Sequence, residues 1–273
     1  MDYKKKFTLG MPTLIEYENI EQNISLCKEL DLGFIELNMN LPQYQIENIE
    51  PAFYRNLMSK HNIFFTLHLP EEINISDFNP RVKEAYIKTI SDGIELAKNI
   101  GIPIINMHLN SGVYFTMPSK KVYLFDKYFD QYMQNINYFG NLAYDLIKEE
   151  DICICIENIG NYNLEFVTEA VEELLRNRCF KLTWDIGHDH SCDCVDSAFI
   201  LSHLSSIKHF HLHDAIGANN HLPLGLGEID IQSKINIAKE FNCTCVIETK
   251  TIDGLRTSVD AFKRNQYSIG GYT

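Results

Sequence analysis

The amino-acid sequence alternates short apolar runs with segments of helical periodicity, and it does so eight times. Each run has the length and composition of a buried strand, and in most of the segments between them apolar residues recur three or four positions apart. Eight strand–helix alternations within roughly 250 residues are typical of a closed (β/α)8 barrel, the TIM barrel. The expected strands span residues 7–13, 33–39, 63–69, 103–109, 152–158, 180–186, 207–213 and 243–249.

The clearest helix signal begins at Asn79 and Pro80, a capping residue followed by proline at the first helical position. Gly101 marks its end, because glycine readily adopts the left-handed conformation that closes a helix. The expected apolar stripe consists of Tyr86, Ile90, Ile94, Ala97 and Ile100. Since no linker divides the chain, we expect residues 1–273 to form a single α/β domain, with a doubly wound open sheet as the alternative architecture.

Composition narrows the class of protein. The formal net charge of -13 and the sequence pI of about 5.2 do not indicate a broad basic surface for nucleic acid. No apolar run is long enough for a membrane span, and the N-terminal residues do not form a signal-peptide core. The eight cysteines lack the pattern of a secreted disulfide framework. We therefore expect a cytoplasmic protein with a small-molecule substrate and no membrane partner.

Histidines and carboxylates recur where the expected strands end. In a (β/α)8 barrel these ends and the loops after them carry the active site. A lone histidine at such a position is usually structural, but consecutive strand ends with the same chemistry predict convergence on one site. The candidates are His68, His108, Glu157, Asp185, His188, His211, Glu248 and, in the loop after the seventh strand, His221.

The two-residue period of a strand supports this convergence. If Glu157 points into the barrel, Cys153 and Cys155 do so too, and His209 follows His211 one layer deeper. If Glu248 points inward, Cys243 and Cys245 face the helices. The two Cys-x-Cys pairs then lie on opposite faces of their strands and cannot form one four-cysteine zinc site.

Imidazoles and carboxylates gathered at one barrel mouth predict a divalent cation, because these groups are ligands for zinc, manganese or iron. The stretch TWDIGHDHSCDC at 183–194 contributes Asp185 and His188 to this site. A local soft-metal site formed by His188, His190, Cys192 and Cys194 is the alternative interpretation. Its spacing lacks the two-residue gap typical of zinc knuckles, so we expect both cysteines to belong to the loop and the next helix.

With these motifs the chain resembles the xylose isomerase-like barrel superfamily, which includes sugar isomerases and epimerases and the endonuclease IV type of apurinic-site endonuclease. The resemblance runs from about His68 to Glu248 through INMHLNSG, CIENIG, WDIGH, HLHDAIG, HLPLGLGEIDI and VIET. In epimerase-like members, the residues matching Glu157, Asp185, His211 and Glu248 hold one divalent metal, and the histidine matching His188 lies beside the substrate. In endonuclease-like members, the residues matching those five, together with His68, His108, His221 and one aspartate, share three zinc ions.

The sequence departs from both patterns. Asn219 stands where the endonuclease-like members have that aspartate, and Leu226 stands where they have a glutamate between two glycines. An amide is a weaker ligand than a carboxylate, which disfavours a third zinc ion. Epimerase-like members often offer the sugar an arginine a few residues after the His211 position, but residues 215–219 contain none.

The resemblance implies a divalent-metal-dependent isomerase or epimerase of a sugar or related polyol. It would act by proton transfer through an enediolate, with one to three ions of manganese or zinc and with Glu157, Glu248 and His188 as catalytic residues. An endonuclease IV-like phosphodiester hydrolase, the one interpretation in which DNA is the partner, and a metal-binding barrel without activity are the alternatives. The protein could also form a homo-oligomer. Expected substrate-binding side chains are Asn219, His213, Tyr114 and Tyr162, although for Tyr114, Phe115 and Tyr162 packing within the loops is the favoured role.

Overall fold

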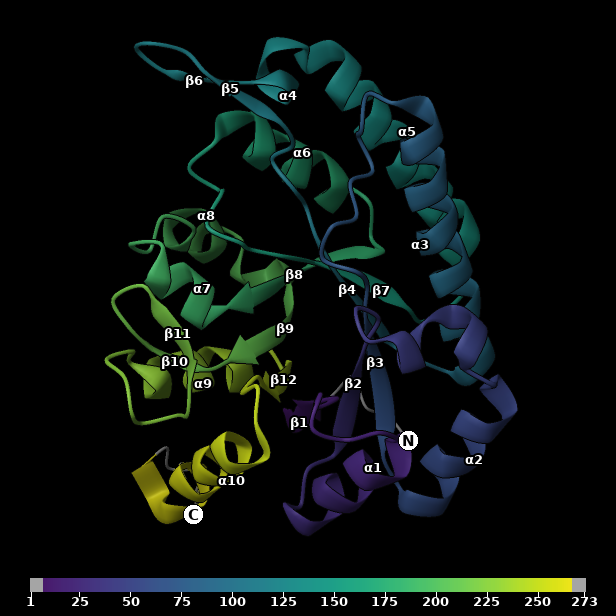
Figure 1. Cartoon of the computed structure of the whole chain (residues 1–273), viewed down its shortest axis with the longest axis vertical. Coiled ribbons are helices and arrows are strands. Elements are labelled where there is room, and N and C mark those ends of the chain that lie inside the picture. Colours follow the sequence, from purple (N-terminus) through teal and green to yellow (C-terminus); the bar gives the residue numbers. More distant parts are fainter. Residues whose placement is uncertain (1–6, 267–273) are drawn as a thin grey trace.

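The computed structural model describes residues 7–266, in which eight parallel strands close into a barrel with helices around its outside (Figure 1). Residues 1–6 and 267–273 of the expected domain 1–273 lie outside the described residues. Going round the barrel, the strand order is β1, β2, β3, β4, β7, β8, β9 and β12, and β12 pairs with β1. The closed ring confirms the (β/α)8 expectation and excludes the open doubly wound sheet.

Each barrel strand falls within one of the eight expected runs. The strands are β1 (Thr8–Pro12), β2 (Phe34–Asn38), β3 (Phe64–His68), β4 (Ile104–His108), β7 (Cys153–Glu157), β8 (Phe180–Asp185), β9 (Ile207–Leu212) and β12 (Thr244–Ile247). The helices are α1 (Ile20–Glu29), α2 (Pro51–His61), α3 (Pro80–Ile100), α4 (Leu124–Lys127), α5 (Phe129–Ile147), α6 (Glu165–Leu175), α7 (Ile186–Ser191), α8 (Ser197–Ser202), α9 (Ile231–Glu240) and α10 (Ile252–Ala261).

Helix α3 has the boundaries that its sequence signals predict. The Asn79 side chain accepts a hydrogen bond from the Arg81 amide, and Pro80 occupies the first helical position. Gly101 ends the helix with a φ of 91°, in the left-handed region. The buried residues of α3 include Ile90, Ile94, Ala97 and Ile100 of the expected stripe. The capping residues and the apolar stripe therefore predict the same helix.

Two β-hairpins lie on segments that the sequence pattern predicts as plain loops. Strands β5 (Tyr114–Thr116) and β6 (Lys121–Tyr123) pair after β4, and their hairpin projects at the upper left of Figure 1. Strands β10 (Asp214–Ile216) and β11 (Asn219–Leu222) pair after β9. Each hairpin pairs backbone groups that a plain loop would leave to water, and Gly217 supplies a φ of 52° in the second turn. The second hairpin carries His221.

The main core lies between the outer face of the barrel and the helices. It includes Ile154, Ile156, Phe210 and Leu212, all fully buried, which confirms the predicted parity of β7 and β9. Inside the barrel the apolar cluster is small, with Phe34, Phe64 and Val246 at its centre. Phe34 fits because β1 has glycine at position 10, where a Cβ atom would lie 2.5 Å from the Phe34 ring. Within residues 7–266 no helix is long and apolar enough to cross a membrane.

Candidate metal centre

The strand ends bring the predicted ionisable side chains together at one end of the barrel. His68, His108, Glu157 and Asp185 are the last residues of β3, β4, β7 and β8. The other members come from β9, α7, β11 and the residue after β12: His211, His188, His221 and Glu248. Segments separated by up to 180 positions, from His68 to Glu248, therefore meet at one polar centre.

The imidazole of His211 is the middle of a four-residue cluster. Its Nδ1 lies 3.2 Å from Glu157 Oε1, 3.4 Å from Glu248 Oε2 and 3.7 Å from Asp185 Oδ2. Two ligands bound at about 2.0–2.2 Å to one ion lie roughly 3.0–3.5 Å apart in tetrahedral or octahedral geometry. Two of the three separations match this spacing and the third is slightly wider.

Several polar atoms at this centre are buried without a hydrogen-bond partner in the described part of the chain. They include His188 Nδ1, His211 Nδ1, His221 Nε2 and Glu248 Oε2. An orphaned polar atom in a buried site is costly unless something satisfies it. Neutral imidazole nitrogens and carboxylate oxygens suit a divalent cation, and Asp185, His211 and Glu248 place such atoms within 4.8 Å of one another. These three residues fit a metal together with Glu157, which lies beside His211.

Glu157 also faces a second group of ligands. Its Oε2 atom lies 3.3 Å from His68 Nε2 and 3.4 Å from His108 Nε2, whereas its Oε1 atom faces His211. His68 Nδ1 lies 2.7 Å from the Leu69 carbonyl oxygen. A carbonyl can only accept, so Nδ1 carries a proton. Burial would lower the pKa of His68, but the hydrogen bond and the charge of Glu157 raise it to about 9, so in the metal-free site Nε2 is protonated as well.

A third cluster, formed by His188, His213 and His221, lies beside the first. The His213 and His221 rings stack with their centroids 4.2 Å apart. His213 Nδ1 accepts the His221 backbone N–H at 2.8 Å, so its proton resides on Nε2, which donates to Asp185. His213 is therefore turned toward Asp185, and only His188 and His221 have buried unpartnered nitrogens here, among the residues that the structure describes.

Burial and charge set the protonation of the metal-free site. Burial opposes ionisation of Glu157, but the charges on His211 and His108 hold its pKa well below its usual range. Burial likewise opposes protonation of His211, but Glu157, Glu36 and Glu248 raise its pKa well above normal. Burial lowers the pKa of His221 to about 3, so this ring is neutral. A bound cation would replace the protons that the carboxylates attract, so metal binding should release protons.

Two buried aspartates hold the loops that carry the site. Asp196 accepts hydrogen bonds from the backbone of Gly160 and Tyr162 and from the Asn158 amide, and thereby fixes the segment after Glu157. Asp214 accepts from the backbone N–H groups of four residues that flank the His221 position on both sides. These residues are Ala215, Gly225, Gly227 and Ile229.

The expected substrate side chains lie in different surroundings. His213 is buried within the centre, whereas Asn219 is exposed at the start of β11. Tyr162 is 5% exposed and packs edge-on against Phe199, and Tyr114 contacts Tyr123 and Lys121 in its own hairpin. In the segment 183–194, His190 pairs with Glu228, and no metal-suited cluster among the described residues includes His190, Cys192 or Cys194.

Three polar residues that contact the centre were not predicted from the sequence. Glu36 lies inside the barrel, 2.9 Å from His211 Nε2. The Asn106 amide donates to Glu157 Oε2, and the Lys250 ammonium lies 2.8 Å from Glu248 Oε1. The two-residue strand period offered a signal for the first two, because Glu36 and Asn106 share an inward face with Asn38 and His108. Lys250 sits in a loop, where no periodicity applies.

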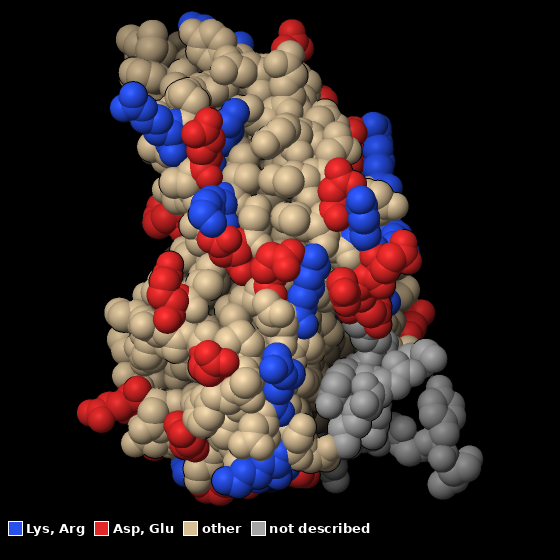
Figure 2. Space-filling view, turned by 90° about the vertical axis from the view of Figure 1, so that its right-hand side faces the viewer, with Lys and Arg blue, Asp and Glu red and all other residues tan. Residues whose placement is uncertain are grey.

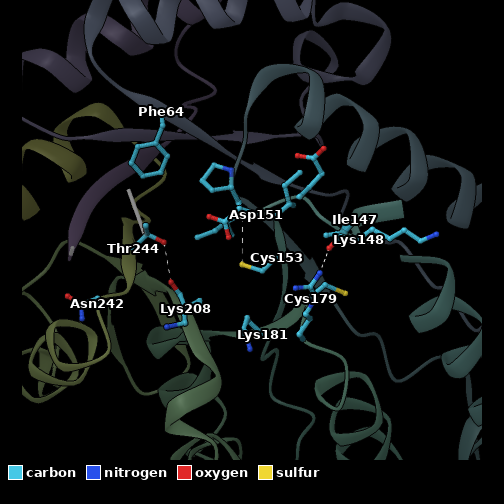
Figure 3. A pocket seen from close by; sticks show the side chains of 15 residues that line it. Phe64, Ile147, Lys148, Asp151, Cys153, Cys179, Lys181, Lys208, Asn242 and Thr244 are labelled. Atoms are coloured by element: carbon cyan, nitrogen blue, oxygen red, sulfur yellow. Dashed lines mark hydrogen bonds between the residues drawn. The ribbon is translucent and has the colours of Figure 1, made fainter. Parts of the chain in front are cut away.

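A cavity of about 360 Å³ lies at the opposite end of the barrel (Figure 3). Its walls include Phe64, Ile104, Cys153 and Thr244, which are the first residues of four barrel strands. None of the predicted site residues lines it. Its position at the N-terminal ends of the strands separates it from the polar centre.

Comparison with known proteins places the chain in a family. The model of the xylose isomerase-like TIM barrel family matches residues 24–265, and the chain belongs to this family. An uncharacterized protein of Methanocaldococcus jannaschii is 25% identical over 240 residues, which are 85% of this chain and 84% of that protein.

Solved structures show the same barrel. A D-tagatose 3-epimerase-like protein superposes with a TM-score of 0.76 at 21% identity, covering 94% of this chain and 96% of that one. The IOLI protein with a bound zinc atom superposes with a TM-score of 0.73 at 15% identity, covering 96% of this chain and all (100%) of that one. The comparisons confirm the expected family and fold.

Proposed function

We propose that the protein is a divalent-metal-dependent isomerase or epimerase of a sugar or related polyol. The observation that carries this proposal is the convergence of Glu157, at the end of β7, and Glu248, directly after β12, on the Nδ1 atom of His211. The sugar epimerases among the similar structures, which include an L-ribulose 3-epimerase and a 3-keto-D-glucoside 4-epimerase, lend it support.

The chemistry requires a cation and two basic groups. A divalent ion held by Glu157, Asp185, His211 and Glu248 would polarise a substrate carbonyl and the neighbouring hydroxyl, stabilising the enediolate. One glutamate removes the proton from the carbon next to the carbonyl, and the other returns a proton to the opposite face. The net change for epimerisation is inversion at that carbon, with no gain or loss of atoms.

Neighbouring side chains prepare these groups. The Lys250 ammonium forms an ion pair with Glu248 Oε1, and the other oxygen of this carboxylate, Oε2, faces His211. His188 lies 3.7 Å from Glu157 Oε1 and is 24% exposed, so it can contact both the site and a small substrate. We propose a sugar-like substrate bound beside His188, His213 and Asn219, and we expect the protein to act in the cytoplasm.

A second candidate is a metal-dependent phosphodiester hydrolase. It is favoured by Glu157, whose two oxygens face two separate ligand groups, as a carboxylate shared by two ions would. Its partner would be DNA. The formal net charge of -13 favours the small-molecule interpretation. The side of the molecule that carries α2, α3 and α5 likewise mixes basic and acidic side chains (Figure 2).

Proton exchange with solvent tests the proposal even while the substrate is unidentified. The manganese-loaded and zinc-loaded proteins are incubated with a panel of ketoses in D2O, and NMR detects deuterium incorporated next to the carbonyl. We expect incorporation into at least one ketose, loss of it after exhaustive chelation, and a lower melting temperature in the chelated protein, because a bound ion stabilises the native state. Cleavage of abasic duplex DNA without exchange into any sugar would reverse the order of the two candidates.

A further inference from the structure

The carboxylate of Glu36 lies inside the barrel, below the candidate metal ligands. It projects from β2 and is 2% exposed. Thr66 donates its hydroxyl to Glu36 Oε2 at 3.0 Å, and His209 Nε2 lies 3.1 Å from the same oxygen. The other oxygen, Oε1, lies 2.9 Å from His211 Nε2. Glu36 therefore joins side chains from three other positions in the barrel interior.

The charge of this carboxylate determines which atoms carry protons. Thr66 donates its hydroxyl to Oε2, and imidazole nitrogens of His209 and His211 lie 3.1 Å from Oε2 and 2.9 Å from Oε1, so donors surround the carboxylate. An anionic carboxylate can only accept hydrogen bonds. His209 consequently presents Nε2–H to Glu36, while its Nδ1 accepts the Thr244 hydroxyl at 2.6 Å.

The same argument fixes the orientation of His211. Its Nδ1 faces the carboxylates of Glu157, Asp185 and Glu248, whereas its Nε2 faces Glu36 alone among the described carboxylates. His211 Nε2 makes no hydrogen bond among the described residues, so its 2.9 Å contact with Glu36 Oε1 is an electrostatic attraction between N–H and carboxylate. With the proton on Nε2, the lone pair on Nδ1 points into the metal centre.

A separate cation bound by Glu36, His209 and His211 is the competing interpretation of this cluster. Both nitrogens of His209 already have hydrogen-bond partners, and Thr66 occupies one lone pair of Glu36 Oε2. Other orphaned atoms lie on the far side of His211, toward Glu157 and Glu248. The donors therefore suit a supporting role for Glu36 better than a second ion.

We infer that Glu36 is a positioning residue that holds His211 as an Nε2–H tautomer and so presents its Nδ1 to the catalytic metal. The inference rests on the metal site of the proposed function. Carboxylates that bind the outer nitrogen of a ligating histidine fix its ring and raise its basicity, and their loss typically lowers metal affinity by about 10–100-fold. Glu36 and the residues around it would thus tune the metal centre from the interior of the barrel.

Zinc affinity, measured by competition with a chromophoric chelator on the metal-stripped full chain, tests this inference. Glu36→Leu should weaken zinc binding by about 10–100-fold. Glu36→Gln should weaken it less, because the amide oxygen can still accept the His211 Nε2–H. Thr66→Val is the matched control: it removes a donor to Glu36 Oε2 but leaves the carboxylate beside His211, so we expect an affinity near that of the unaltered protein.

Nitrogen-15 NMR of the histidines supplies a readout that general loosening would not mimic. In the unaltered zinc-loaded protein, the His211 Nε2–H proton should exchange slowly and show a hydrogen-bonded shift, and Glu36→Leu should abolish both features. Circular dichroism identifies a variant that fails to fold, in which case Glu36→Gln decides the question. Unchanged zinc affinity in a folded Glu36 variant would overturn the inference, as would an unaltered protein that binds no zinc. Zinc binding that depends on Glu36 without exchange into any sugar would instead reject the proposed function alone.

Discussion

The two faces of the barrel strands have different roles, although their residues alternate along the same strands. The outer face packs apolar side chains, and the inner face pairs buried ionisable ones. On β9, Phe210 faces the helices, is fully buried and packs against Trp184 with ring centroids 5.9 Å apart. Its neighbours His209 and His211 face inward and are equally buried, yet their partners are carboxylates. Equal burial therefore has two different consequences, because the outer face gains from removing apolar surface from water and the inner face must compensate buried charge.

This contrast indicates where stability and function reside. The outer face belongs to one continuous apolar cluster, whereas the apolar cluster inside the barrel is limited to a few residues around Phe34. Buried ionic groups are a weak source of stability, since desolvation offsets much of their attraction. We therefore expect substitutions on the outer face to unfold the protein and substitutions on the inner face to disable a folded one.

The largest effect is expected from Phe210→Ala. Removing a buried phenylalanine typically lowers the free energy of unfolding by about 3–5 kcal/mol, because apolar contacts are lost and a cavity remains. Urea unfolding of the metal-stripped protein measures this loss. The matched inner variant, Glu248→Gln, keeps the shape of the side chain and removes one of the three carboxylates that face His211 Nδ1, so it should change the same free energy much less while it weakens metal binding. Similar losses in the two variants would contradict the division between the faces.

A smaller effect in energy, but a decisive one for activity, is expected from Glu248→Gln. The amide keeps the shape of the side chain and removes its basicity, so turnover should fall at least about a hundredfold, the lower range for loss of a general base. The equivalent change at Glu157 should behave alike. The measurement is the rate of deuterium incorporation into the substrate found in D2O, with circular dichroism to confirm the fold. Near-full turnover in Glu248→Gln would remove this residue from the mechanism.

The barrel and most of the candidate site were predictable from the sequence because both depend on local periodicity. Strand length, the two-residue alternation and the common end at which parallel strands finish place residues such as Glu157 and Asp185 without reference to any contact. The predicted inward side of Cys155 and outward side of Cys245 follow from the same rule, and the outer core contains Cys245 but not Cys155.

What the sequence did not reveal depends on partners far apart in the chain. Glu36 is the one charged residue of β2, and its partner His209 lies 173 residues away in the chain. The hairpin β10–β11 was missed because its strands are short and one of them begins with asparagines. The stacking of His213 on His221 depends on that hairpin, and on Gly187, where a Cβ atom would lie 2.0 Å from the His213 ring.

The smallest expected effect concerns Asn219, at the edge of the inner polar region. His188 and His221 each offer a buried nitrogen there without a partner among the described residues, while His213 is engaged by the His221 backbone and by Asp185. Two neutral imidazoles give a cation no charge compensation, and an exposed asparagine adds none.

Asn219→Asp would add a carboxylate two positions along the chain from His221. We therefore expect it to raise zinc content by up to one ion per chain, measured by elemental analysis after zinc loading and gel filtration. Ala218→Asp, on the exposed neighbouring residue of the hairpin turn, is the matched control for added charge alone. If the unaltered protein already carries three zinc ions, Asn219 does not prevent the binding of a third ion. The phosphodiester hydrolase then becomes the stronger candidate.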